Sequence, residues 1–175
     1  MAFNVEIKAR LRDRAGVEAT LKTLRAAGPT VLRQLDVFFP TPTGRLKLRT
    51  INDAAGELIH YDRPDATGPK TSDYAIAAVP SPADMRTVLA RAFGEKTVVE
   101  KVRTLYLIGP TRIHLDEVKG LGDFLEFEVV LNSADQAEAG RKIADDLLAR
   151  LGIAPEDLVT GAYADLLASS TTQRS

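Results

Sequence analysis

Alternating polar and apolar side chains mark the segment from Asn4 to Arg12 as a β-strand. In an extended chain, successive side chains point to opposite faces. One face of this strand then carries charged side chains of both signs, namely Glu6, Lys8, Arg10 and Arg12. The other face is apolar. The segment therefore predicts a strand between a packed layer and a strongly ionic one.

The same period of two returns along the chain and predicts seven further strands, at residues 31–39, 45–51, 57–63, 72–79, 96–108, 111–117 and 124–131. Helical spacing of apolar residues, together with capping residues, predicts helices at 15–27, 82–93 and 133–151. Residues 155–167 are expected to form a short capping segment. We predict one domain over residues 1–168 and a disordered tail at 169–175.

Eight strands, several of them in hairpin order, predict an α+β fold built on an antiparallel sheet or barrel. Periodicity alone leaves two geometries open. In the first, the charged residues form the wet face of an open sheet whose apolar face is covered by helices. In the second, the sheet closes on its charged face and becomes a barrel with an ionic lumen and helices on its outside.

Composition and charge narrow the possible functions of this chain of 175 residues. The net charge is -1 and aromatic residues are few, so a nucleic-acid partner is not expected. There is no cysteine, and His60 and His114 stand far apart, which argues against a zinc site. The sequence shows neither a signal peptide nor a membrane span, and we expect a soluble cytoplasmic protein.

An ionic lumen would need ligands of matching chemistry, because buried charges are costly without partners. Lysine and arginine side chains bind phosphate oxygens through charge-assisted hydrogen bonds. Carboxylates bind hard divalent cations such as Mg²⁺. If the sheet closes on its charged face, the sequence predicts a tunnel that holds a polyanion together with divalent cations.

Several short motifs resemble those of the CYTH proteins, also called triphosphate tunnel metalloenzymes, over nearly the whole chain. The family opens with E-x-E-x-K, which reads Asn4-Val5-Glu6-Ile7-Lys8 here. The other matching stretches are Gly44 to Arg49, Tyr61 to Pro64, Gly68 to Ser72, Lys101 to Arg103, Arg112 to Asp116, Leu121 to Glu128 and Tyr163 to Leu167. The middle and the end are most similar to the bacterial class IV adenylate cyclase-like branch.

This resemblance implies an eight-stranded antiparallel tunnel, a nucleotide or inorganic triphosphate as substrate, and Mg²⁺ or Mn²⁺ as cofactor. It implies metal ligands at Glu6, Asp116, Glu126 and Glu128, and catalytic roles for Glu6, Lys8 and Glu128. The phosphate-binding residues would be Lys8, Arg45, Lys47, Arg49, Arg63, Lys70, Lys101, Arg103 and Arg112. A monomer or a homodimer without a membrane partner is expected. We expect His114 to be structural and Tyr163 to serve packing.

One position departs from the family pattern, because Asn4 replaces the first glutamate of the motif. An asparagine offers an oxygen without a charge, so metal affinity or the number of metals would be lower. Three functions stay open from the sequence. A ribose 3′-hydroxyl as nucleophile would give cyclic AMP and pyrophosphate from ATP, and water would make the protein an inorganic or thiamine triphosphatase. The third is a non-catalytic module that binds polyphosphate or nucleotides.

Overall fold

The computed structural model describes residues 3–62, 70–71 and 73–172. Within these residues the chain forms one antiparallel sheet of nine strands. The strands are β1 (Phe3–Arg10), β2 (Ala27–Phe39), β3 (Arg45–Ile51), β4 (Ala55–Asp62), β5 (Lys70–Thr71), β6 (Asp73–Val79), β7 (Thr97–Ile108), β8 (Thr111–Val118) and β9 (Gly122–Leu131). The helices are α1 (Arg14–Thr23), α2 (Pro82–Phe93), α3 (Ala137–Arg150) and α4 (Tyr163–Thr172), with short 3₁₀ turns at Ala134–Gln136 and Pro155–Asp157.

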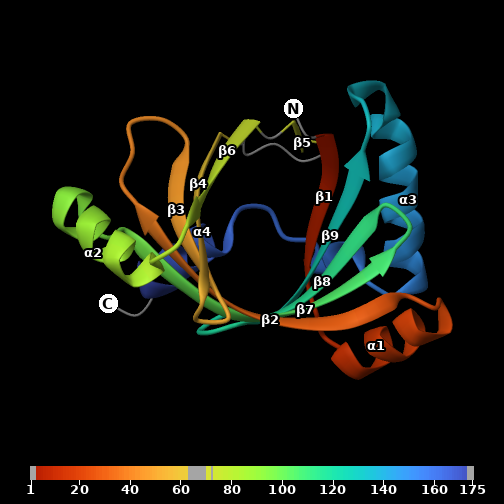
Figure 1. Ribbon diagram of the computed structural model, residues 1–175. Helices are drawn as coiled ribbons and strands as arrows, with labels where there is room; N and C mark the ends of the chain where they lie inside the picture. Colours follow the sequence, from red (N-terminus) through yellow and green to blue (C-terminus); the bar gives the residue numbers. More distant parts are fainter. Residues whose placement is uncertain (1–2, 63–69, 72, 173–175) are drawn as a thin grey trace.

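The sheet curls into a tunnel (Figure 1). Its strand order is β5-β1-β9-β8-β7-β2-β3-β4-β6, so β5 and β6 lie at its two edges. Only residue 72 separates these edge strands in the sequence, and β5 pairs with β1 while β6 pairs with β4. One chain segment thus joins both edges. The predicted eight-stranded tunnel with helices on its outside is confirmed. The strand predicted at 72–79 corresponds to β6, and the two-residue strand β5 is a ninth strand that the sequence did not predict.

Apolar side chains on the outer face of the sheet pack against the helices, as the barrel geometry predicted. Leu11, Ile113, Leu115, Leu125 and Phe127 form the largest core cluster, with Val17 and Leu21 of α1 and three leucines at the end of α3. A second cluster joins Leu89 of α2 to Val37, Phe39 and Leu48. Helices α1, α2 and α3 lie on the outside of the curled sheet (Figure 1) and bury its apolar face, so the charged face is left to line the tunnel.

The first helix ends earlier than its apolar pattern predicted. α1 stops at Thr23, and β2 begins at Ala27 rather than at residue 31. Pairing of Ala27 with Leu107 of β7 overrides the turn expected at Gly28-Pro29. The backbone at Gly28 adopts φ +118°, and a Cβ there would lie 2.7 Å from the carbonyl oxygen of Leu105, so only glycine fits this close approach.

The C-terminal segment closes one end of the tunnel. It crosses behind the opening in Figure 1 and continues into α4, a helix of 10 residues where only a short capping segment was expected. The helix runs to Thr172, beyond the domain boundary predicted after residue 168. Tyr163 and Ala164 pack there on Phe38, Val99, Val118 and Phe124, which extend from the inner face of the sheet. No helix of the described residues is long and apolar enough to span a membrane.

Candidate functional site

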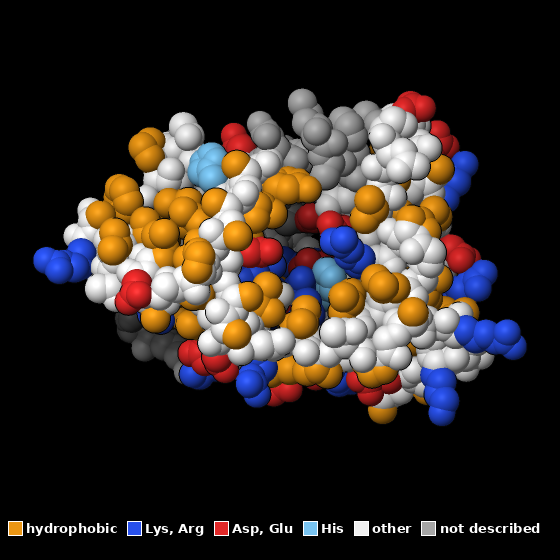
Figure 2. Space-filling view, in the orientation of Figure 1, with side chains coloured by type: hydrophobic (Ala, Val, Ile, Leu, Met, Phe, Trp, Pro, Cys, Tyr) orange, Lys and Arg blue, Asp and Glu red, His pale blue; other side chains and the backbone are white. Residues whose placement is uncertain are grey.

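Charged side chains from β1, β2, β3, β7, β8 and β9 converge inside the tunnel, and Figure 2 shows blue and red atoms within the central hollow. The pairing register supports this picture, because Lys8 lies opposite Glu126, Glu6 opposite Glu128, and Arg103 opposite Asp116. Residues opposite each other in a sheet share a face. The tunnel therefore brings together most of the residues that the sequence singled out, and they form four groups.

The first group is centred on Asp36 of β2, which the sequence analysis did not select. Arg49 donates to both oxygens of this carboxylate at 2.7 Å, and Lys47 Nζ donates to Oδ2 at 3.1 Å. Burial alone would raise the pKa of Asp36, but Lys47 and Arg49 outweigh burial and hold that pKa well below its usual range. Asp36 therefore stays charged and fixes two predicted phosphate-binding cations.

The second group surrounds Asp116 of β8, which is fully buried. Arg103 donates to its two oxygens at 2.7 and 2.6 Å, Lys101 Nζ lies 3.5 Å from Oδ2, and the Tyr163 hydroxyl donates to the same oxygen at 2.9 Å. Asp116, which was predicted as a metal ligand, therefore orients the cations of Arg103 and Lys101. Tyr163, expected to serve packing, packs on Phe124 and also completes the polar network.

The third group joins Lys8 of β1 to the C-terminal segment. Lys8 Nζ donates to the carbonyl oxygen of Gly161 at 2.9 Å, lies 3.8 Å from Glu126 Oε2, and lies 4.2 Å from the ring centroid of Tyr163. Burial would raise the pKa of Glu126, but the His114 ring, whose Nδ1 lies 3.7 Å from Glu126 Oε1, and the charges of Lys8 and Arg103 hold that pKa well below its usual range. Glu126 is therefore a carboxylate at neutral pH.

The fourth group contains the oxygen ligands best suited to a metal. Asn4 Nδ2 donates to Glu6 Oε1 at 3.3 Å and to Glu128 Oε1 at 3.0 Å, so the amide bridges two carboxylates. The Asn4 Oδ1 atom is buried and has no hydrogen-bond partner. Two carboxylates and an amide oxygen fit Mg²⁺ or Mn²⁺, because such ions often take only one or two carboxylates and complete their coordination with water and phosphate.

Among the described residues, no three Asp, Glu or His side chains gather closely enough to form a metal site by themselves. The metal ligands implied by the family resemblance are therefore divided, with Glu6 and Glu128 together and Asp116 in a different group. Gln34 Oε1 and His114 Nδ1 are, like Asn4 Oδ1, buried polar atoms without a hydrogen-bond partner. All three residues lie on the inner face, and buried polar atoms of this kind mark places where a ligand can bind.

The remaining predicted cations lie at the periphery of the site or outside the described residues. Arg45 pairs with Asp165 of α4 at 2.9 Å, and the half-exposed Arg112 lies 3.6 Å from Glu128. Arg63 lies outside the described residues. For Lys70 only the backbone is described, and it pairs in β5 with Asn4.

Burial lowers the pKa of Lys101 to about 8, aided by the neighbouring charge of Arg103.

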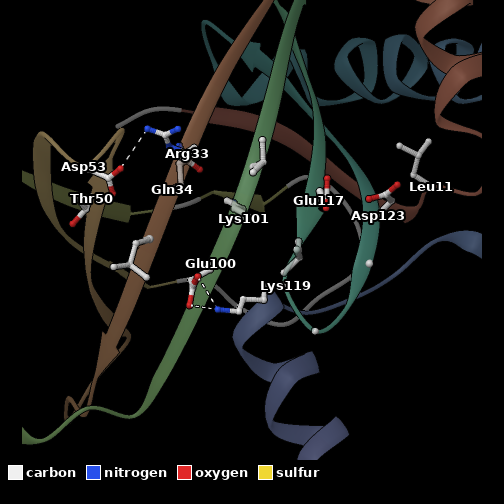
Figure 3. A pocket seen from close by; sticks show the side chains of 15 residues that line it. Leu11, Arg33, Gln34, Thr50, Asp53, Glu100, Lys101, Glu117, Lys119 and Asp123 are labelled. Atoms are coloured by element: carbon white, nitrogen blue, oxygen red, sulfur yellow. Dashed lines mark hydrogen bonds and ion pairs between the residues drawn. The ribbon is translucent and has the colours of Figure 1, made fainter.

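A groove of about 800 Å³ is also lined by residues of β2, β7 and β8 and of the turn that follows β8 (Figure 3). Its charges pair across the groove itself, with Lys119 Nζ 2.9 Å from Glu100 Oε1 and Arg33 Nη2 3.4 Å from Asp53 Oδ2. The residues of these pairs are exposed, and Lys101 is the one buried cation of the tunnel among the residues that line the groove. The tunnel is therefore the stronger candidate for a functional site.

Comparison with known proteins agrees with this architecture. Adenylate cyclase CyaB of Aeromonas hydrophila is 29% identical over 186 residues, which cover 99% of this chain and 93% of that relative. The solved structure of the PH1012 protein from Pyrococcus horikoshii is 27% identical, with a TM-score of 0.82 over 95% of this chain and 99% of the other. A candidate adenylate cyclase from Vibrio parahaemolyticus shares the fold at 19% identity and a TM-score of 0.78, over 95% and 98% of the two chains.

The CYTH domain family matches residues 2–163. This match spans nearly all of the tunnel and its ionic lumen. The chain therefore belongs to the CYTH domain family.

Proposed function

We propose that this protein is a metal-dependent enzyme that binds ATP in the tunnel and converts it to cyclic AMP and pyrophosphate, as a class IV adenylate cyclase does. The observation that carries this proposal is the division of the lumen into clusters of buried cations and a separate carboxylate pair, Glu6 and Glu128. The similarity to a relative named adenylate cyclase supports the choice of reaction.

In this proposal the basic groups hold the triphosphate. Lys47 and Arg49 lie on one wall, Lys101 and Arg103 on the next, and Lys8 beside them. Each group already has an acidic partner, so the cations are preorganised before the ligand arrives. Phosphate oxygens would add to these contacts, because each cation has more than one N–H to donate.

Glu6 and Glu128 would hold the divalent cation, with Asn4 Oδ1 as a third oxygen and Glu126 nearby. When bound, that cation supplies positive charge against the phosphate oxygens. The ribose 3′-oxygen attacks the α-phosphorus, the bond from that phosphorus to the oxygen bridging to the β-phosphorus breaks, and pyrophosphate leaves. The 3′-hydroxyl proton passes to a carboxylate of the same wall. We assign to Asp116 the orientation of Arg103 and Lys101 rather than metal binding.

A triphosphatase is the second candidate, and one observation favours it. The cation clusters recognise phosphate oxygens only, so they would also hold inorganic or thiamine triphosphate with water as the nucleophile.

Replacement of the family's first glutamate by Asn4 lowers the negative charge available for metals, and this favours the third reading, a module that binds without turnover.

Product analysis tests these alternatives. Purified protein is incubated with ATP, tripolyphosphate or thiamine triphosphate, each with Mg²⁺, with Mn²⁺ or with a chelator, and products are resolved by chromatography. We expect cyclic AMP and pyrophosphate from ATP, dependent on the metal and lost in Glu128→Gln but retained in Glu138→Gln on the exposed face of α3. Phosphate release without cyclic AMP would assign the protein to the triphosphatases, and absence of turnover would favour the binding module.

A further inference from the structure

Two large side chains of β6, Tyr74 and Ile76, are unusually open for residues of their size. Their exposed fractions are 46% and 53%. Val79, on the outer face of the same strand, is buried against α2. Strand alternation puts Tyr74 and Ile76 on the opposite face from Val79. They therefore belong to the wall of the tunnel.

The pairing register confirms this placement. Tyr74 lies opposite Tyr61, which in turn lies opposite Arg45. Ile76 lies opposite Ile59, which in turn lies opposite Lys47. Rows of this kind share one face of the sheet, so Tyr74 and Ile76 face the same space as the basic residues of β3. Strand β4 lies between β6 and β3, so these two strands are about 10 Å apart across the sheet.

The wall made by β4 and β6 differs in chemistry from the rest of the lumen. Ile59, Tyr61, Tyr74 and Ile76 line it, whereas β1, β8 and β9 contribute charged groups on the other side. Figure 2 shows hydrophobic atoms on the side of the hollow that carries β4 and β6, and charged atoms within the hollow. The tunnel thus has an apolar, partly aromatic wall that runs directly into the cation clusters.

We propose that Tyr74 and Ile76 form the binding surface for the base of a nucleoside triphosphate whose phosphates lie among the basic residues. A base has a flat apolar face that stacks on an aromatic ring, and stacking accepts any base. Inorganic triphosphate has no group that would use this wall. Tyr61 and Ile59 are already packed, so the open surface of Tyr74 and Ile76 is the part left for a ligand. The inference rests on the proposed function only in taking the clusters to bind a triphosphate.

Binding measurements on matched variants test this surface. α,β-Methylene-ATP, which cannot release pyrophosphate, and inorganic tripolyphosphate are titrated calorimetrically into the wild type, Tyr74→Ala, Ile76→Ala and Tyr74→Phe. Because the side chains are exposed, the variants should fold, which circular dichroism checks. We expect Tyr74→Ala to weaken binding of the ATP analogue roughly tenfold and to leave tripolyphosphate binding within about twofold. Tyr74→Phe keeps the ring and should bind like the wild type, and so should Val88→Ala, a control on the exposed face of α2.

Equal loss for both ligands would overturn the inference, because it would indicate a structural role for Tyr74. Unchanged binding of the ATP analogue in Tyr74→Ala and Ile76→Ala would also overturn it. The cyclase assignment fails separately, in the product analysis. If no cyclic AMP forms while Tyr74→Ala still weakens the ATP analogue selectively, the base-binding surface stands and the reaction alone has to be reassigned.

Discussion

At the scale of single residues, buried acids keep the cations of the tunnel in place. Asp36 and Asp116 each bind an arginine through two hydrogen bonds and have a lysine within 3.5 Å. Buried ion pairs contribute little net stability, but breaking one by removing a single partner is costly because the other charge stays buried. These acids should therefore matter for stability as well as for binding.

The variant Asp36→Asn should show this cost. It leaves Lys47 and Arg49 without their counter-charge, and we expect a loss of about 3–5 kcal/mol in the free energy of unfolding, measured with urea. Added tripolyphosphate should restore part of the loss by supplying negative charge to the same cations. The control is Asp53→Asn, whose 84% exposed side chain pairs with Arg33 on the surface and should change stability by less than about 0.5 kcal/mol. Similar losses in both variants would contradict the assignment.

Lys101 should give ligand binding a distinctive pH dependence. With its pKa lowered to about 8, this lysine loses its charge as the pH rises through 8, and triphosphate affinity should fall by up to about tenfold per pH unit above that point. The stability of the free protein should change in the opposite direction. Between pH 8 and the ordinary lysine pKa the unfolded state binds more protons, so the cost of the buried charge is relieved as the pH rises.

Both effects are differences between the wild type and Lys101→Met, measured by titration calorimetry and urea unfolding from pH 7 to pH 10. A pH profile that is the same in the variant would show that another group is responsible.

Asn4 offers a test of the metal site. The variant Asn4→Asp adds a negative charge beside Glu6 and Glu128, and we expect tighter Mn²⁺ binding by roughly tenfold, since affinity for hard cations rises with ligand charge. Titration calorimetry with Mn²⁺ measures the change, and the surface variant Asn132→Asp should leave affinity unchanged. Weaker binding in Asn4→Asp would place the metal elsewhere.

At the scale of elements, the sequence located strands better than it located the last helix. Strand alternation is a local property, and the predicted strands at 45–51 and 111–117 agree with β3 and β8 to within one residue. The early start of β2 depends on pairing with β7, and the role of α4 depends on what Tyr163 meets inside the tunnel. Such contacts join residues far apart in sequence, so periodicity carries no signal for them. The sequence analysis did not select Asp36, although strand alternation places it on the same face as Gln34 and Phe38.

The C-terminal segment links three parts of the tunnel, through Gly161 to Lys8, Tyr163 to Asp116, and Asp165 to Arg45. Tyr163→Phe removes one hydroxyl and keeps the ring. Because that hydroxyl donates to a buried carboxylate, we expect a loss of about 1–3 kcal/mol in the free energy of unfolding, seen in urea melts. Tyr106→Phe, where the ring packs against the outer core, should lose less. No loss in Tyr163→Phe would show that Arg103 and Lys101 satisfy Asp116 without the tyrosine hydroxyl.

At the scale of the whole molecule, the sequence left the choice between an open sheet and a closed tunnel undecided, and only the family resemblance selected the tunnel. The strands that carry the charged residues have a charged face in both geometries. What decides between them is which face the helices cover, and this depends on Leu11, Ile113 and Phe127 packing together with α1 and α3. The prediction of the functional residues depended on that choice. In an open sheet the charged residues would be a solvated surface, and in a closed tunnel the same residues line a binding site.

A protein with this many buried cations should be stabilised by the ligand that it binds. We expect tripolyphosphate at a hundredfold excess over its dissociation constant to raise the free energy of unfolding by about 2.7 kcal/mol. Thermal melts with and without the ligand measure this, and orthophosphate at equal charge concentration is the control. An equal effect from orthophosphate would mean that the cations act singly rather than as one site.

The apolar cluster at the α4 end also has a consequence for kinetics. A tunnel filled at that end by Phe38, Val118, Phe124 and Tyr163 admits and releases molecules through the opposite mouth. A linear molecule that enters with its phosphates first leaves in the reverse order. In the proposed reaction, cyclic AMP would depart before pyrophosphate, which lies deeper. Pyrophosphate would then compete with the next ATP, and its exit rather than bond formation would limit the rate of turnover.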